Sequence, residues 1–343
     1  MPERDALDPA ELWFVAHGLP YFVDSYRARV AGGLQRGRIA AVVAIASAVG
    51  LVVGLVTAVP LSAAAGVGAA LSATGLVLAT YAVATLRAWL IVGWALRRTF
   101  SSLGLLLPLV TRALPLLLLF ITFLFINAEV WQVSAALDGG VLWVTVLLFA
   151  GVAVGFLLTR LPEELDSVDD EVDSHELLDA CRGTPLEAAA EAIAGRVERV
   201  GAVDAEVTGL QKVNLVLVLL VSQAVQVLLL ALSVFAFFIL FGVVAMDPDV
   251  VASWTGGDLH PILSSVGAWD GDRLSRELVQ VSVFLAAFSG LYFTVYAVTD
   301  DVYRKQFFSS VIRELERAVS ARVAYRWLQD GNLSNVDGSD GST

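Results

Sequence analysis

Cysteine, histidine and lysine are scarce in this chain of 343 residues. The one cysteine, Cys181, excludes an intramolecular disulfide and a thiol-rich metal site. His17, His175 and His260 lie in three separate regions, which argues against a histidine metal site. The sequence therefore predicts neither a bound metal nor a cofactor.

Catalytic signatures are also missing. The chain has no HExxH, GxSxG, Walker A or CxxC motif, so a hydrolase, an ATPase or a redox enzyme has no positive support. No basic stripe runs through the sequence and the net charge is -12, so we expect no nucleic acid partner. The pattern favours a protein that is not an enzyme.

Charged residues make up only 16% of the chain, whereas 57% of the residues are hydrophobic. An average soluble domain is about 25% charged and 45–50% apolar. The mean hydropathy of +0.74 therefore requires that much of the chain faces lipid. We expect an all-α, polytopic membrane helix bundle embedded in the lipid bilayer.

Apolar runs predict about six transmembrane helices, at about 39–60, 64–86, 112–132, 141–159, 213–246 and 278–298. The expected organisation is a cytosolic amphipathic region over 1–38, spans one to four over 39–160, an acidic and partly helical cytosolic insert over 161–212, spans five and six over 213–298 with an outer loop at 247–277, a cytosolic amphipathic helix over 299–330, and a disordered tail over 331–343. Within the first region, a short helix is expected to start at Asp8 and to stop at Gly18.

Small residues at helical spacing predict close helix packing in three of the spans. They are Ala46, Gly50 and Gly54 in the first span, Gly68, Ser72 and Gly75 in the second, and Gly151 and Gly155 in the fourth. Spans one and two are expected to form a hairpin. Two points stay open: residues 88–96 either lie at the interface or extend span two, and the long fifth run must tilt, bend or protrude.

The orientation follows from the basic residues, because cytoplasmic flanks of spans carry an excess of Lys and Arg. With six spans, only Arg273 and Arg276 fall outside. The sequence therefore predicts a multi-pass protein of the cell membrane with both termini in the cytoplasm.

Polar residues recur on one face of spans three, five and six, and Glu129 is the leading candidate because ionisable residues within spans are rare. The expected polar-path positions are Glu129, Gln132, Thr122, Ser222, Gln226, Ser289, Tyr292 and Tyr296. They would line a path for a small solute or ion. The alternative is interhelical hydrogen bonds, worth about 0.6 kcal/mol each on average.

These patterns support two functions. The first is a channel or secondary transporter that uses the polar faces of spans three, five and six. The second is a non-catalytic membrane scaffold or sensor that binds a cytosolic protein partner through the acidic insert and the C-terminal helix. The sequence predicts neither the substrate nor the oligomeric state.

Three strings carry a resemblance: RALPLLLLFITFLFINAEVWQ, VNLVLVLLVSQAVQVLLLAL and SGLYFTVYAVTDDVYRKQFF. Over roughly residues 100–310 the chain resembles a group of uncharacterised multi-pass integral membrane proteins of high-GC actinobacteria. The resemblance implies a membrane-spanning fold and carries no known activity.

Overall fold

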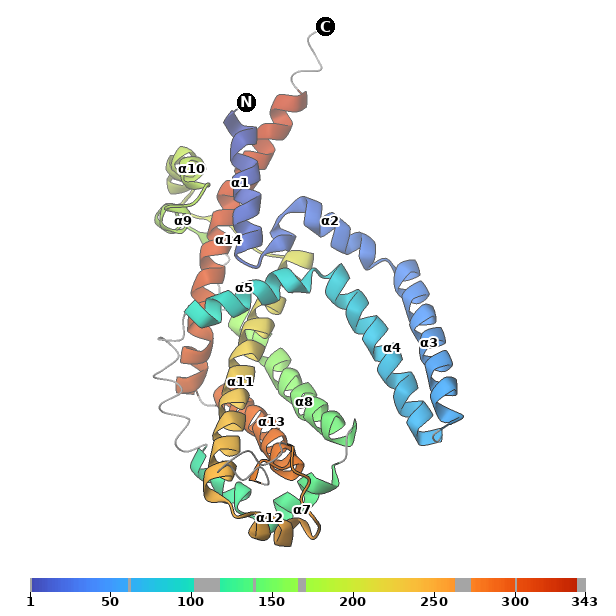
Figure 1. The fold of residues 1–343 in the computed structure, drawn as a ribbon. Coiled ribbons are helices and arrows are strands. Elements are labelled where there is room, and N and C mark those ends of the chain that lie inside the picture. Colours follow the sequence, from blue (N-terminus) through green and yellow to red (C-terminus); the bar gives the residue numbers. More distant parts are fainter. Residues whose placement is uncertain are drawn as a thin grey trace. The chain divides into compact units, whose positions relative to one another are not determined.

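The computed structural model describes residues 2–60, 63–101, 118–137, 140–165, 171–262, 273–299 and 301–337, which are predominantly helical (Figure 1). Five helices there are long and apolar enough to cross a membrane. They are α3 (Arg36–Ala58), α4 (Ala63–Thr85), α8 (Gly140–Leu165), α11 (Gly209–Ala245) and α13 (Arg276–Thr299). The prediction of a helical chain with several candidate membrane spans is confirmed.

The third predicted span is not one straight helix. Its described part consists of Leu118–Phe125 and α7 (Ala128–Ala136), which meet at an angle of 75°. At the break, Asn127 has extended backbone angles and its side chain accepts a hydrogen bond from the Glu129 amide at 2.8 Å. The indole of Trp131 donates to the Phe125 carbonyl at 2.6 Å, which satisfies an acceptor that the break leaves without its helical partner. Pro115 lies outside the described residues.

The chain divides into two compact units. Unit 1 contains residues 1–95, 168–218 and 314–343, and unit 2 contains residues 96–167 and 219–313. Each unit is built from segments that are distant in the sequence.

In unit 1, α3 and α4 form the predicted hairpin. A Cβ placed on Gly50 would lie 2.7 Å from the Ala70 carbonyl oxygen, and one on Gly54 would lie 2.9 Å from the Gly66 carbonyl oxygen. Both glycines are therefore required for this approach. The predicted packing face of α4 is wrong, because the residues that meet α3 are Gly66, Ala70 and Thr74. A Cβ on Gly68 or Gly75 would have no neighbour within 4 Å among the described residues.

After α4 the chain turns at Arg87, which has a φ of 52°. Helix α5 (Ala88–Ser101) begins directly afterwards, so residues 88–96 form a separate helix and do not extend α4. This break is consistent with the interfacial placement. The Tyr21 hydroxyl donates to the Leu86 carbonyl at 2.6 Å and attaches the end of α4 to η1 (Pro20–Phe22).

We call the polar part of unit 1 the head. It contains α1 (Pro2–Ala16), α9 (Ser174–Cys181), α10 (Glu187–Val200), the antiparallel pair β1 (Glu171–Val172) and β2 (Val203–Asp204), and α14 (Asp301–Asp337) from Glu314 onward. Helix α1 starts before the predicted cap, so that Asp8 and Pro9 lie inside it, and it ends before Gly18 as predicted. Helix α14 continues to Asp337, and residues 338–343 lie outside the description.

The first part of the fifth run is grouped apart from the rest, because α11 belongs to unit 1 up to Val218. Asn214, fully buried, accepts a hydrogen bond from the Tyr21 amide at 2.8 Å and donates one to the Gly18 carbonyl at 3.0 Å. These bonds join the start of α11 to η1. The remaining part of α11 lies in unit 2.

Unit 2 packs α13 against α8 and α11. The Phe149 ring of α8 lies 5.8 Å from the Phe284 ring of α13. On the other side, a Cβ on Gly290 would lie 3.3 Å from Val227 of α11. Within the described residues, neither Gly151 nor Gly155 has a neighbour within 4 Å of a Cβ, so the predicted close contact there stays a prediction. Helices α7 and α12 (Pro248–Thr255) adjoin through the rings of Trp131 and Trp254, 6.1 Å apart.

Candidate functional site

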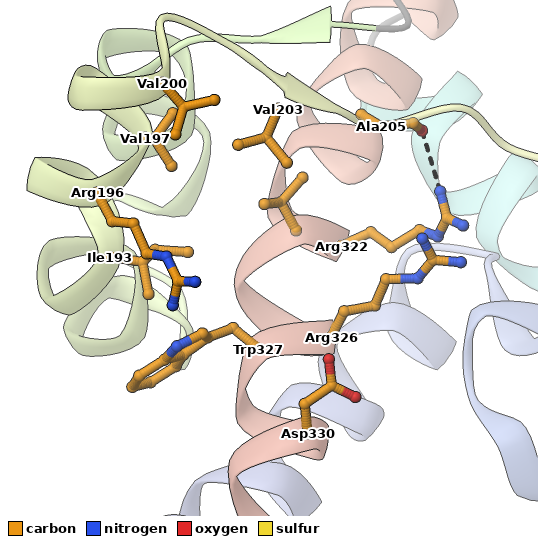
Figure 2. A pocket seen from close by; sticks show the side chains of 11 residues that line it. Ile193, Arg196, Val197, Val200, Val203, Ala205, Arg322, Arg326, Trp327 and Asp330 are labelled. Atoms are coloured by element: carbon orange, nitrogen blue, oxygen red, sulfur yellow. Dashed lines mark hydrogen bonds between the residues drawn. The ribbon is translucent and has the colours of Figure 1, made fainter.

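The head contains a cleft of about 350 Å³ between α10, β2 and α14 (Figure 2). Helix α14 forms one side, and α10 with the start of β2 forms the other. The insert and the C-terminal helix, which are more than a hundred residues apart, thus enclose one site. Its volume lies within the range of small-molecule sites, about 300–1,000 Å³.

The inner surface of the cleft is apolar. Ile193 and Val197 are buried on α10, and Val203 of β2 and Val323 of α14 are half-buried. Helical spacing places Ile193 and Val197 on one face of α10. This lining favours the aliphatic or aromatic part of a ligand.

Trp327 and Arg196 lie at the rim of the cleft. Figure 2 shows Arg196 reaching from α10 toward the indole of Trp327 on α14. The side chain of Trp327 is 36% exposed and Arg196 is exposed, so both are accessible from water. An aromatic face beside a guanidinium suits a planar group with a nearby negative charge.

Arg322 is a fixed part of the wall. Its Nη1 donates to the carbonyl oxygens of Ala205 at 3.0 Å and Glu206 at 2.9 Å. The residue is 2% exposed, and its guanidinium carbon lies 5.9 Å from the ring centroid of Phe22. These contacts hold the strand that follows α10 against α14.

Positive charge dominates the lining. The lining contains three arginines, Arg196, Arg322 and Arg326, and a single carboxylate, Asp330. In Figure 2 the guanidinium of Arg326 lies next to that of Arg322, on the side of α14 away from Arg196. Within the described residues, no carboxylate forms an ion pair with Arg196 or Arg326. The cleft is therefore electropositive in a protein whose net charge is -12.

Other contacts fix α14 within the head. Arg317 donates to the carbonyl oxygens of Ala180 at 2.9 Å and Arg182 at 3.0 Å. The Tyr325 hydroxyl donates to Glu11 of α1 at 3.2 Å. Burial, followed by the charge of Glu11, raises the pKa of Tyr325 above its ordinary value. The cleft thus has a rigid frame from three segments of the chain.

The chemistry of the cleft is that of binding. The described residues that line it include no serine, cysteine or histidine that would act as a nucleophile or general base. Cys181 lies in α9, and burial raises the pKa of its thiol to about 12. Across the described part of the chain, no three or more His, Cys, Asp or Glu side chains are grouped to hold a metal ion.

No protein family model, curated protein or solved structure matches this chain.

The residues predicted from sequence for a polar path all lie in unit 2. Glu129 and Gln132 are exposed on α7, and Thr122 is half-buried before the break. Tyr292 and Tyr296 are 43% and 36% exposed, and their rings stack at 6.4 Å. Phe120 stacks on Tyr292 at 5.6 Å.

The remaining predicted positions are more buried. The Ser289 hydroxyl donates to the Leu285 carbonyl of its own helix at 2.6 Å. The Ser222 hydroxyl and the Gln226 carbonyl oxygen are buried on α11 and have no hydrogen-bond partner within the described residues. A cost of about 1–3 kcal/mol accompanies a buried polar group of this kind. Transport through these positions stays a prediction.

A cavity of about 500 Å³ lies between α8, α11 and α13 in unit 2. None of the eight predicted polar-path residues lines it. Its described lining carries two side-chain polar groups, the indole N–H of Trp143 and the Thr294 hydroxyl, and the hydroxyl donates to the Gly290 carbonyl at 2.8 Å. This cavity offers nothing that would replace the hydration shell of an ion.

Sequence reasoning missed the cleft. It predicted an amphipathic helix over 299–330 but did not single out Arg322 and Arg326, which lie four residues apart on one face. That spacing was a usable signal. Arg196 could not be assigned to the same site without knowing that α10 packs against α14.

Proposed function

We propose that this chain is a membrane-anchored sensor or scaffold whose functional site is the cleft of the head. This is the second of the two functions that the sequence favours. The observation that carries the proposal is the electropositive, apolar-walled cleft between α10, β2 and α14. The transport function is the rival.

The packing of the head supports a binding role. The insert and the C-terminal helix contact each other through the hydrogen bonds of Arg317 and Arg322. Helix α14 also contacts α1, because the rings of Phe14 and Tyr325 lie 5.3 Å apart. A ligand or partner in the cleft would thus contact α14, which is packed against both the insert and the N-terminal helix α1.

The described part of unit 2 gives transport less support. Its cavity is apolar, and Glu129 is exposed on α7 rather than enclosed with the polar residues of α11 and α13. By the positive-inside rule, the excess of basic residues in the segments outside the spans favours a cytoplasmic head. The partner is therefore expected to be cytosolic.

Two measurements on the purified full-length protein test the proposal. In liposomes of neutral lipid, we expect no flux of Na⁺, K⁺, H⁺ or Cl⁻. In nanodiscs incubated with cytosol from the native cell, we expect slower hydrogen exchange in peptides from α10 and α14. Val203→Phe, which fills the cleft, should abolish this protection.

Arg199→Gln is the matched control, since Arg199 is exposed on α10, does not line the cleft and donates to the Gly195 carbonyl of its own helix. It should keep the protection. Ion flux that disappears in Glu129→Gln, together with unchanged exchange in α10 and α14, would refute the sensor function and favour transport.

A further inference from the structure

The cleft has the chemistry of a site for one class of ligand. It combines an excess of positive charge with an apolar inner wall and an indole at the rim. A purely inorganic anion would leave the half-buried side chains of Val203 and Val323 uncovered. A purely apolar ligand would leave Arg196 and Arg326 without a counter-charge at its edge.

We propose that the cleft binds a small organic anion, a phosphate or carboxylate attached to an aromatic or aliphatic body. The anionic group contacts Arg196 at the rim or Arg326 beside Arg322, and the body lies against Trp327 and the valines of α10 and β2. This inference rests on the proposed function and names its ligand class.

The exposed arginines are the groups available to the ligand. Two donor bonds of the Arg322 Nη1 are directed at the carbonyl oxygens of Ala205 and Glu206, so Arg322 acts as a positioning residue. Arg196 and Arg326 have no carboxylate partner within the described residues, and a bidentate bond to phosphate or carboxylate is the strongest contact that a guanidinium makes.

The surroundings of Arg326 add to the preference for an anion. Arg27 of α2 (Asp24–Gly33) forms an ion pair with Asp24, and burial and then the charge of Arg326 lower the pKa of Arg27. An anion bound at Arg326 would reduce this repulsion between like charges.

The size of the cleft favours a small molecule over a protein surface. A volume of about 350 Å³ falls at the lower end of the range for drug-sized ligands. Its lining comes from three short stretches, 193–205, 322–323 and 326–330. An acidic protein segment would need contacts beyond this lining. Titration with a small organic anion distinguishes a small-molecule ligand from such a segment.

The test uses the full-length protein in nanodiscs of phosphatidylcholine and 1-naphthyl phosphate as the probe. Calorimetric titration should show binding that weakens with added salt, because Arg196 and Arg326 are exposed. Inorganic phosphate has only the anionic group and 1-naphthol only the aromatic body. Each should therefore bind at least about tenfold more weakly than 1-naphthyl phosphate.

Variants locate the site. At least one of the two substitutions Arg196→Gln and Arg326→Gln should weaken the binding of 1-naphthyl phosphate about tenfold or more, because a charge-assisted hydrogen bond is lost. Trp327→Leu should weaken 1-naphthyl phosphate more than phosphate itself. Arg199→Gln should bind as the wild type does. Near-identical thermal unfolding of these variants shows that each folds.

A second set of nanodiscs containing phosphatidylglycerol identifies the source of the anion. Competition with the probe would assign a lipid headgroup, and unchanged probe binding would assign a free metabolite. The inference is overturned if 1-naphthyl phosphate does not bind, or binds equally to all four variants. If the probe fails while cytosol still protects α10 and α14, the sensor function stands with another ligand, such as an acidic protein segment.

Discussion

The Nη1 of Arg322 donates a hydrogen bond of 3.0 Å to the carbonyl oxygen of Ala205, a residue 117 positions earlier in the chain. Both residues are 2% exposed. A single buried guanidinium thus connects the strand that closes the insert to the C-terminal helix. The cleft exists because this connection holds its two sides together.

Arg322→Gln should destabilise the head more than any other arginine substitution at the cleft. A hydrogen bond to a charged group contributes about 1.5–3 kcal/mol, and the substitution removes the bonds that Arg322 donates to the buried Ala205 carbonyl and to the part-buried Glu206 carbonyl. Thermal unfolding in detergent and hydrogen exchange in residues 201–207 measure the effect. Arg326→Gln, at an exposed position one turn later, should change stability by less than about 0.5 kcal/mol.

Gly50→Leu should separate α3 from α4. The added side chain would meet Thr74 and the Ala70 carbonyl, and overpacking of this kind costs about 1–3 kcal/mol or more. Gly75→Leu on the same hairpin is the control, because a Cβ there has no described neighbour within 4 Å. Equal unfolding temperatures for the two variants would contradict the observed face of α4.

The sequence predicted helix positions well and helix rotation less well. Long apolar runs predict spans because lipid leaves few alternatives, and the stripe from Ala46 to Gly54 was correct. In α4 almost every residue is small or apolar, so several faces appear equally suited to packing. The choice of Gly66, Ala70 and Thr74 over Gly68 and Gly75 depends on how α3 packs against α4.

The break at Asn127 and the cleft could not be predicted for a related reason. In the sequence, a capping asparagine within an apolar run cannot be distinguished from any other polar residue near a membrane surface. The indole of Trp131 is recognised as the donor to the Phe125 carbonyl only from the geometry of the structure. The cleft requires that Arg196 and Arg326 belong to one site. Nothing in single-sequence periodicity gives contacts between elements so far apart.

Asn214→Leu should loosen the junction between α11 and η1. The Tyr21 amide would lose its acceptor and the Gly18 carbonyl its donor, with a cost of about 1–3 kcal/mol for each buried group. Asn214→Asp retains an acceptor for the Tyr21 amide and should be less harmful. Hydrogen exchange at residues 18–22 reports the difference, and equal exchange in both variants would show that these bonds contribute little.

Cys181 should be nearly unreactive in the folded protein. Its side chain is fully buried, and burial raises the pKa of the thiol from 9.0 to about 12, while Arg317 lowers it in part. The thiolate is the reactive form, so iodoacetamide at pH 8 should modify Cys181 far more slowly than it modifies the urea-unfolded chain.

The same thiol gives stability a defined pH dependence. Because the folded pKa is raised, the protonated thiol is the form in both states below pH 9, and its contribution to stability is constant there. Between pH 9 and about 12 the unfolded state loses the proton first, so stability falls by up to about 1.4 kcal/mol per pH unit. Cys181→Ala should remove this component of the decline. If Cys181→Ala loses stability with rising pH as steeply as the wild type does, α9 does not enclose the thiol. Reaction of the folded protein with iodoacetamide at the rate of the unfolded chain would lead to the same conclusion. Either result would also contradict the contact by which Arg317 holds α9 against α14.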